Sequence, residues 1–265
     1  MKYVHIVTVG ASLASNYERE KKGQRRPEAE LEEMLNRMHA AEKALYRKDL
    51  QRFLTEKDRA GKIVETCAEL NGLSRYFDET SLVYLIHTDT ELGRCCAGAL
   101  KDHLEGRGLQ VAEPIEVEGL HGPETFQRGL ANLVGRIANI LTQHEDVRIC
   151  ATGGFKPEVA LASVLGFIAQ APVYYIHESF RREVHIPSLP VDWRYEVKRF
   201  SDVIDAIIAA GEGGVEKEWF TKKFGHDTYY TFIKNRLIEE RGERCMASEV
   251  SLAILKAVRQ LSKRR

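Results

Sequence analysis

Apolar, β-rich stretches alternate with amphipathic helical stretches in the first part of the chain, and this alternation constrains the fold more than any other feature. The strands predicted from these stretches are 3–9, 81–88, 110–117, 147–151 and 172–176. The helices predicted between them are 91–107, 124–143 and 157–170, in which apolar residues recur at helical spacing. A succession of this kind is typical of a parallel sheet with helices on both faces. The sequence therefore predicts a Rossmann-like α/β fold with a doubly wound, mostly parallel sheet, and a short edge strand at 184–187.

A second feature, residues 17 to about 78, interrupts this rhythm. The segment is densely charged at first, yet its leucines and methionines recur at helical spacing up to Asn71-Gly72, which we expect to end a helix. We interpret it as two or three helices inserted after the first strand. A solvated helical hairpin on the sheet edge is the favoured interpretation, and a lid over a ligand or a dimer arm is the alternative.

The tail of the chain is helical in character from Trp193 onward. Helical patterns at 216–224, 228–240 and 247–261 predict a small bundle, for which a winged-helix arrangement is one interpretation. We therefore expect a Rossmann domain over 1–190 and a separate small domain over 193–265. The basic end of the tail leaves contact with nucleic acid open, but no recognition-helix pattern supports it, and a dimerisation or packing module is favoured.

Composition excludes several classes of protein. The formal net charge is zero, so no global field attracts nucleic acid. No apolar run approaches the length of a membrane span, and the N-terminus has no signal-peptide shape. The five cysteines include no C-x-x-C pair, which argues against a disulfide framework and against a zinc site. We expect a cytoplasmic protein with reduced thiols, no membrane contact, no bound metal and no cofactor.

Small and polar residues follow three of the predicted strands. They form the turns Gly10-Ala11-Ser12-Leu13, Thr88-Asp89-Thr90 and Thr152-Gly153-Gly154-Phe155-Lys156. Ligands bind at the carboxyl ends of the strands in an open parallel sheet, and glycines let backbone N–H groups approach an anion. These turns predict a phosphate-binding site, to which Lys156 adds a positive charge. Helix capping is the favoured explanation of Ser12 and Asp89 when each is taken alone, and a solvated lysine explains Lys156 equally well.

Two common nucleotide-binding motifs are absent from the sequence. No G-x-G-x-x-G follows a strand, and no G-x-x-x-x-G-K-[ST] occurs. A dinucleotide oxidoreductase and a P-loop NTPase are therefore unsupported.

With these turns and the strand end Tyr175-Ile176-His177-Glu178 in view, the first 190 or so residues resemble the CRISPR-associated Rossmann-fold (CARF) family. In that family two subunits form a two-fold pocket that binds cyclic oligoadenylate. The resemblance implies a homodimer and a ligand that is cyclic tetra-adenylate, or else cyclic hexa-adenylate. It implies ligand contacts from Gly10, Ala11, Leu13, Thr88, Asp89, Thr152, Gly153, Gly154, Phe155 and His177.

The resemblance extends to the standalone ring nucleases of type III CRISPR systems, which degrade the messenger and carry a small winged-helix-like domain. It implies metal-independent attack by a ribose 2′-hydroxyl, with Ser12 and Lys156 as catalytic residues. His177 and His121 are candidate proton carriers, although ordinary loop histidines explain both.

Two alternatives stay open. A non-catalytic sensor would pass the signal to a DNA-binding tail. A messenger-activated nuclease would carry its active site in the tail, with Tyr229, Tyr230, Lys234 and Arg236 as candidates. The tail shows neither the Arg-x(4–6)-His spacing of HEPN ribonucleases nor the spaced acids and strands of a PD-(D/E)xK nuclease.

Overall fold

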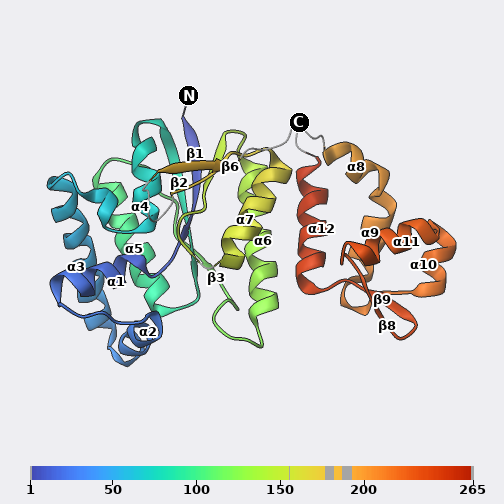
Figure 1. The fold of residues 1–265 in the computed structure, drawn as a ribbon, viewed down its shortest axis with the longest axis horizontal. Coiled ribbons are helices and arrows are strands. Elements are labelled where there is room, and N and C mark those ends of the chain that lie inside the picture. Colours follow the sequence, from blue (N-terminus) through green and yellow to red (C-terminus); the bar gives the residue numbers. More distant parts are fainter. Residues whose placement is uncertain (1, 155, 177–181, 187–192, 264–265) are drawn as a thin grey trace.

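A six-stranded sheet forms the centre of the first part of the computed structural model, which describes residues 2–154, 156–176, 182–186 and 193–263 (Figure 1). Its strands are β1 (Tyr3–Val9), β2 (Thr80–Thr88), β3 (Ile115–Val117), β4 (Val147–Cys150), β5 (Val173–Ile176) and β6 (Glu183–Ile186). They lie in the order β3-β2-β1-β4-β5-β6, with β1 to β5 parallel and β6 antiparallel at the edge. This order confirms the predicted doubly wound sheet. The strand predicted over 110–117 is shorter, and Val111 only bridges to Val83.

Helices cover both faces of the sheet. They are α1 (Ser12–Lys21), α2 (Glu28–Arg37), α3 (Ala40–Arg59), α4 (Ala68–Leu73), α5 (Glu91–Gly106), α6 (Phe126–Gln143) and α7 (Lys156–Ala169), with the 3-10 turns η1 (Ile63–Glu65) and η2 (Ser74–Glu79). Helices α1 to α5 share one face, and α6 and α7 cover the other (Figure 1). The chain crosses to the second face after β3, so the strand order reverses between β1 and β4.

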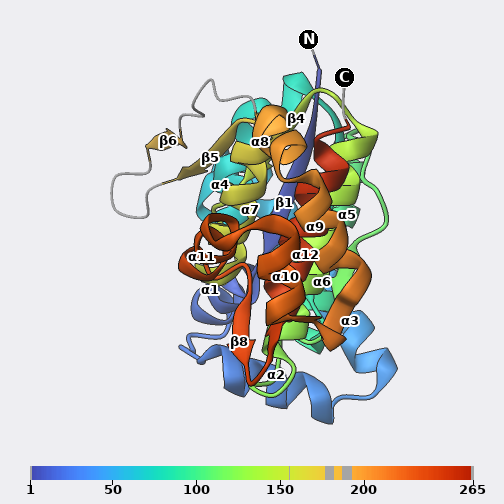
Figure 2. The same cartoon turned by 90° about the vertical axis from the view of Figure 1, so that its right-hand side faces the viewer.

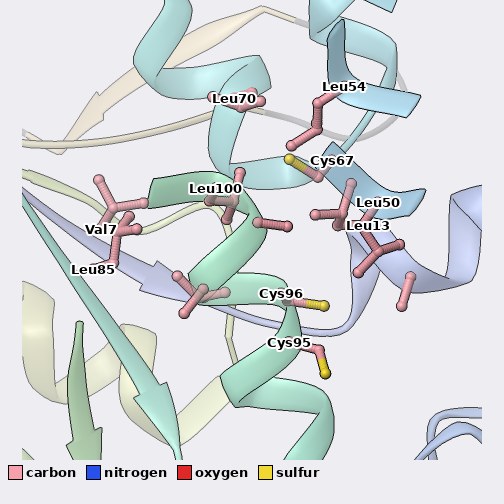
Figure 3. Packing of buried hydrophobic residues seen from close by; sticks show 14 of the residues in the cluster. Val7, Leu13, Leu50, Leu54, Cys67, Leu70, Leu85, Cys95, Cys96 and Leu100 are labelled. Carbon is pink, nitrogen blue, oxygen red and sulfur yellow. The ribbon is translucent and has the colours of Figure 1, made fainter. Parts of the chain in front are cut away.

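The segment 17–78 packs over one face of the sheet, with α4 against the strands and α2 and α3 against α5, so the expected solvated hairpin on the sheet edge is wrong. Leu50, Leu54 and Leu70 are fully buried in one cluster with Val7 of β1 and Leu100 of α5 (Figure 3). A narrow apolar stripe on each charged helix is enough to bury these leucines. The insertion is therefore part of the core that supports the sheet.

Gly72 lies inside α4 and does not end a helix, contrary to the sequence prediction. A Cβ atom on Gly72 would lie 2.7 Å from the sulfur of Cys150 in β4. The missing side chain lets α4 lie directly against the sheet, which brings the start of α4 close to the ends of β1 and β4.

The tail combines helices with a small antiparallel sheet. Its elements are α8 (Trp193–Arg199), α9 (Ser201–Ala210), η3 (Gly211–Gly213), β7 (Val215–Glu216), α10 (Lys217–Phe224), α11 (His226–Lys234), β8 (Glu239–Arg241), β9 (Arg244–Met246) and α12 (Glu249–Leu261). The sheet order is β7-β9-β8. The order helix–strand–helix–helix–strand–strand, from α9 to β9, is that of a winged helix. The predicted helix 228–240 ends early at Lys234, and Arg236 then adopts a left-handed φ of 55°.

Helix α12 belongs to two apolar clusters. Leu252 and Leu255 are buried with the other tail helices, whereas Ala257 and Leu261 are buried with residues of α6 and α7. Figures 1 and 2 show α12 alongside α6, with the rest of the tail on its outer side. The tail is thus packed against the helical layer of the sheet that faces away from the insertion.

Candidate functional site

The candidate site lies where the strand order reverses. Strands β1 and β4 are neighbours in the sheet, and the connections that follow them run over opposite faces. Such a switch point opens a crevice at the carboxyl ends of the strands, where open α/β proteins bind ligands. The turn at Gly10 follows β1, and the turn at Thr152 follows β4.

A pocket of about 320 Å³ opens between these turns. It is lined by Val9, Gly10, Ala11, Ser12, Ser15, Glu28, Ala68, Glu69, Thr88, Thr90, Leu92, Gly93, Thr152, Gly153 and Gly154. The structure therefore brings together eight residues of the three strand-end turns, namely Gly10, Ala11, Ser12, Thr88, Thr90, Thr152, Gly153 and Gly154.

The turn after β4 is held by buried side chains. The hydroxyl of Thr8, in β1, donates to the carbonyl oxygen of Gly153. The backbone N–H of Ile176 donates to the Thr152 hydroxyl over 3.2 Å. Gly154 has a φ of 95°, which a side chain would make unfavourable. The glycines are thus needed for the shape of the turn as well as for the approach of a ligand.

Ser12 is the first residue of α1, and its hydroxyl does not cap that helix. Its Oγ accepts a hydrogen bond of 3.0 Å from the backbone N–H of Ala68, the first residue of α4. The same hydroxyl donates to Oε2 of Glu69 over 3.1 Å. Ser12 therefore connects the turn after β1 to the inserted helix α4.

Glu69 is a pocket residue that the sequence prediction missed. Its carboxylate accepts from Gly10 N over 2.7 Å as well as from Ser12, and the residue is only 1% exposed. Burial raises the pKa of Glu69, whereas the hydrogen bond from Gly10 acts in the opposite direction and lowers it. The only feature of the sequence that could have indicated Glu69 is an acidic residue within the apolar stretch around Cys67 and Leu70. Acidic residues occur in such stretches too often for this one to be singled out.

The turn after β2 is organised by threonines. Thr90 caps α5, since its hydroxyl accepts from Gly93 N over 3.0 Å, and it lies 2.9 Å from the hydroxyl of Thr88. Asp89 points to another loop, where its Oδ2 accepts from Gly119 N over 2.9 Å. Thr88 lines the pocket and Asp89 does not.

The other predicted residues that the structure describes lie outside the pocket. Lys156 is exposed at the first residue of α7, directly after the turn that lines the pocket. Leu13 is fully buried in the core (Figure 3), so only its backbone is available to a ligand. Phe155 and His177 lie outside the described residues. His121 is exposed in the loop after β3.

The charge of the pocket is negative. Among the described residues that line it, Glu28 and Glu69 are the only ones with charged side chains. Burial is the larger cause of a raised pKa of Glu28, and the negative charge of the neighbouring Glu32 raises it further. An anionic ligand would therefore depend on backbone N–H groups, and on cations beyond the pocket such as Lys156.

The described part of the chain offers neither a cluster of metal ligands nor a membrane-spanning helix. No group of three His, Cys, Asp or Glu side chains there could hold a metal ion. No helix in those residues combines the length and apolar character needed to cross a membrane.

The candidates in the tail do not form one site. Tyr229 is buried in the tail core and donates to Glu240, whereas Tyr230 is 63% exposed. Arg236 lines a different cleft, of about 1260 Å³, between α6, α12 and the β8–β9 hairpin. The arrangement therefore offers no support for an active site built from these residues.

Comparison with known proteins gives one family match. Residues 64–189, just under half of the chain, match the family model described as CRISPR-associated protein (Cas_APE2256). The matched segment includes the Thr88 and Thr152 turns and Glu69, but not the turn at Ser12.

Among the solved structures similar to the chain is Can2 from Sulfobacillus thermosulfidooxidans in complex with cyclic tetra-adenylate. It shares 14% sequence identity, and the match covers 70% of this chain and 60% of the Can2 chain, with a TM-score of 0.31. A similarity at this level carries no argument about the function of the chain.

Proposed function

We propose that the chain is a CARF-type protein and a metal-independent ring nuclease, a proposal supported by the match of residues 64–189 to a CRISPR-associated family model. In this proposal it binds a cyclic oligoadenylate, the tetra-adenylate by preference, at a pocket shared between two copies. It opens the ring to linear products that end in a 2′,3′-cyclic phosphate, and so ends type III CRISPR signalling.

The convergence of two glycine-bearing turns in one pocket at the switch point is the observation that carries the proposal. Gly10 and Ser12 come from one turn, and Gly153 and Gly154 from the other. Backbone N–H groups, a hydroxyl and the start of α7 together suit the phosphates of a nucleotide ligand. Neither of the two turns offers all of these groups by itself.

The size of the pocket supports a shared site. Its volume of about 320 Å³ is at the lower end of the range of about 300–1,000 Å³ that is usual for drug-sized ligands. A ring of four nucleotides is larger than such a ligand. A second copy related by two-fold symmetry would supply an equal pocket, and a second set of turns, for the rest of the ring.

The chemistry needs positioning more than acid–base groups. The 2′-oxygen attacks the neighbouring phosphorus and loses its proton, the bond from phosphorus to the 5′-oxygen breaks, and that oxygen takes up a proton. In our proposal Lys156 and the N–H of Gly154 stabilise the added negative charge, and Ser12 holds the phosphate in line. Phe155 would add a second N–H group, as predicted from the sequence.

Product analysis tests the proposal. The protein is incubated with cyclic tri-, tetra- and hexa-adenylate in the presence of a chelator, and the products are identified by mass spectrometry. We expect linear oligoadenylates with a 2′,3′-cyclic phosphate, formed fastest from the tetra-adenylate. Intact rings after long incubation, or cleavage only on addition of a divalent metal, would contradict the proposal.

A second candidate function is a sensor with a DNA-binding tail, and the winged-helix order of α9 to β9 favours it. Fluorescence anisotropy with labelled duplex DNA, with and without cyclic tetra-adenylate, separates the two functions. Salt-sensitive DNA binding that changes with the messenger, together with an intact ring, would support the sensor.

A further inference from the structure

Two hydrogen-bond donors of the turn after β1 are already occupied in this structure. Gly10 N donates to Oε1 of Glu69 over 2.7 Å, and Ser12 Oγ donates to Oε2 over 3.1 Å. A serine hydroxyl carries one proton and can accept two hydrogen bonds. While Ser12 donates to an ionised Glu69, it therefore has no proton to donate to a phosphate.

Glu69 is enclosed on several sides and has little room to move away. It is 1% exposed, and a Cβ atom on Gly153 would lie 2.5 Å from its Oε1. The carboxylate thus lies between the two turns that define the pocket. A ligand that displaced it would have to move a buried side chain out of a close-fitting site.

Among the described residues, the groups that act on the charge of Glu69 include no cation. The titratable groups that face it are the thiols of Cys67, Cys96 and Cys150, contributed by the segment before α4, by α5 and by β4. Burial raises the pKa of each thiol and of Glu69 itself, so the thiols are neutral. Across the pocket lies Glu28, another acid.

We propose that Glu69 takes up a proton from solvent when a phosphate enters this pocket, and thereby releases the Ser12 hydroxyl to the ligand. This inference rests on the proposed function, because it assumes a ligand that carries phosphates. Protonated Glu69 donates from Oε2 to Ser12 Oγ, while its Oε1 still accepts from Gly10. Ser12 then accepts from Glu69 and Ala68 and donates its own proton to the phosphate, so every group is satisfied.

The driving force is repulsion between like charges. A phosphate beside an ionised carboxylate in a buried site favours the neutral form of the carboxylate. Because binding takes up a proton, affinity must fall as the pH rises, by up to about tenfold per pH unit. Glu69 is in this sense a positioning residue that acts through Ser12.

Calorimetry tests the inference. Binding of cyclic tetra-adenylate to the full-length protein is measured at one pH in two buffers with different heats of ionisation, which gives the number of protons taken up. We expect uptake approaching one proton for the wild-type protein and none for Glu69→Gln. The glutamine can accept from Gly10 and donate to Ser12, so this variant should bind with an affinity that is nearly independent of pH.

Glu28→Gln is the matched control, since Glu28 is a second acid in the same pocket with a raised pKa. This variant should keep the proton uptake. Uptake that is absent in wild type, unchanged in Glu69→Gln, or lost in Glu28→Gln would overturn the inference. If Glu69→Gln does not fold, the infrared difference spectrum of the wild-type protein must gain a protonated-carboxyl band on binding, and its absence would equally overturn the inference.

The outcomes for the inference and for the proposed function are distinguishable. Binding with proton uptake but without cleavage supports the inference and contradicts the ring-nuclease activity. Cleavage without proton uptake supports the ring-nuclease activity and contradicts the inference. Failure of every cyclic oligoadenylate to bind would contradict both.

Discussion

The backbones of Gly10 and Gly154 are in close contact, since a Cβ atom on Gly10 would lie 3.0 Å from the backbone nitrogen of Gly154. These residues are far apart in the sequence, and each belongs to one of the two turns of the site. The contact shows that the turns form one structural unit, in which a shift of one moves the other.

Gly10→Ala should therefore impair ligand binding as well as folding. The added methyl group would push the two turns apart by a few tenths of an ångström, and overpacking of this kind costs about 1–3 kcal/mol. We expect affinity for cyclic tetra-adenylate to fall at least several-fold, as measured by calorimetry. The control is Gly135→Ala in α6, where a Cβ atom meets nothing within 4 Å; equal losses in both variants would contradict the argument.

Thr8→Val should loosen the turn after β4. Thr8 is buried, and its hydroxyl donates to the carbonyl oxygen of Gly153. Valine would leave that carbonyl without its donor, at a cost of about 1–3 kcal/mol in the free energy of unfolding. Urea unfolding measures this loss, and binding of cyclic tetra-adenylate should weaken in parallel.

Thr80→Val is the matched control for Thr8→Val. Thr80 is also a buried strand threonine, and its hydroxyl donates to the carbonyl oxygen of Tyr76 over 2.7 Å, away from the pocket. The Thr80→Val variant should lose a similar amount of stability and keep its affinity for cyclic tetra-adenylate. A loss of affinity as large as that of Thr8→Val would mean that the turn has no special role.

The sheet and the two turns could be predicted from the sequence because both depend on local signals. Buried strands such as 3–9 are continuous apolar runs, and Gly153-Gly154 between a strand and a helix is a recognisable turn. The position of Glu69 could not be predicted, since it depends on how α4 packs against the ends of β1 and β4. No pattern near residue 69 reports that packing.

The hairpin of β8 and β9 was missed for a different physical reason. All three residues of β8 are exposed and charged, so the strand has no alternation of apolar and polar residues. The same stretch continues the helical spacing that begins at Thr228. The left-handed backbone at Arg236, which ends the helix, has no signal in the sequence because arginine rarely adopts it.

Acidification should destabilise the protein partly through His5. Burial, and then the charge of Arg148, lower the pKa of His5 from 6.5 to about 3. Between these values the unfolded chain binds a proton that the folded chain does not, so stability rises with pH across this window. The stabilising effect of neutral His5 is complete above pH 6.5 and is lost as the pH falls toward 3.

His5→Asn removes this titration and should reduce the pH dependence. We expect the free energy of unfolding of the wild-type protein to fall more steeply below pH 6.5, by up to about 1.4 kcal/mol per pH unit from His5. Urea unfolding at several pH values measures the difference. His226→Asn, at an exposed residue of α11, is the control and should keep the wild-type slope. Equal slopes for wild type and His5→Asn would contradict the assignment.

Lys156→Ala should separate cleavage from binding. Lys156 begins α7, directly after the turn that lines the pocket, and the described residues of the pocket supply no cation. If its charge acts on the transition state, its loss should lower turnover of cyclic tetra-adenylate about 10²–10³-fold and weaken binding far less. Single-turnover cleavage and equilibrium binding, measured on the same preparation, give the two values. Lys48→Ala, at an exposed residue of α3, should change neither, and wild-type turnover by Lys156→Ala would remove this residue from the mechanism.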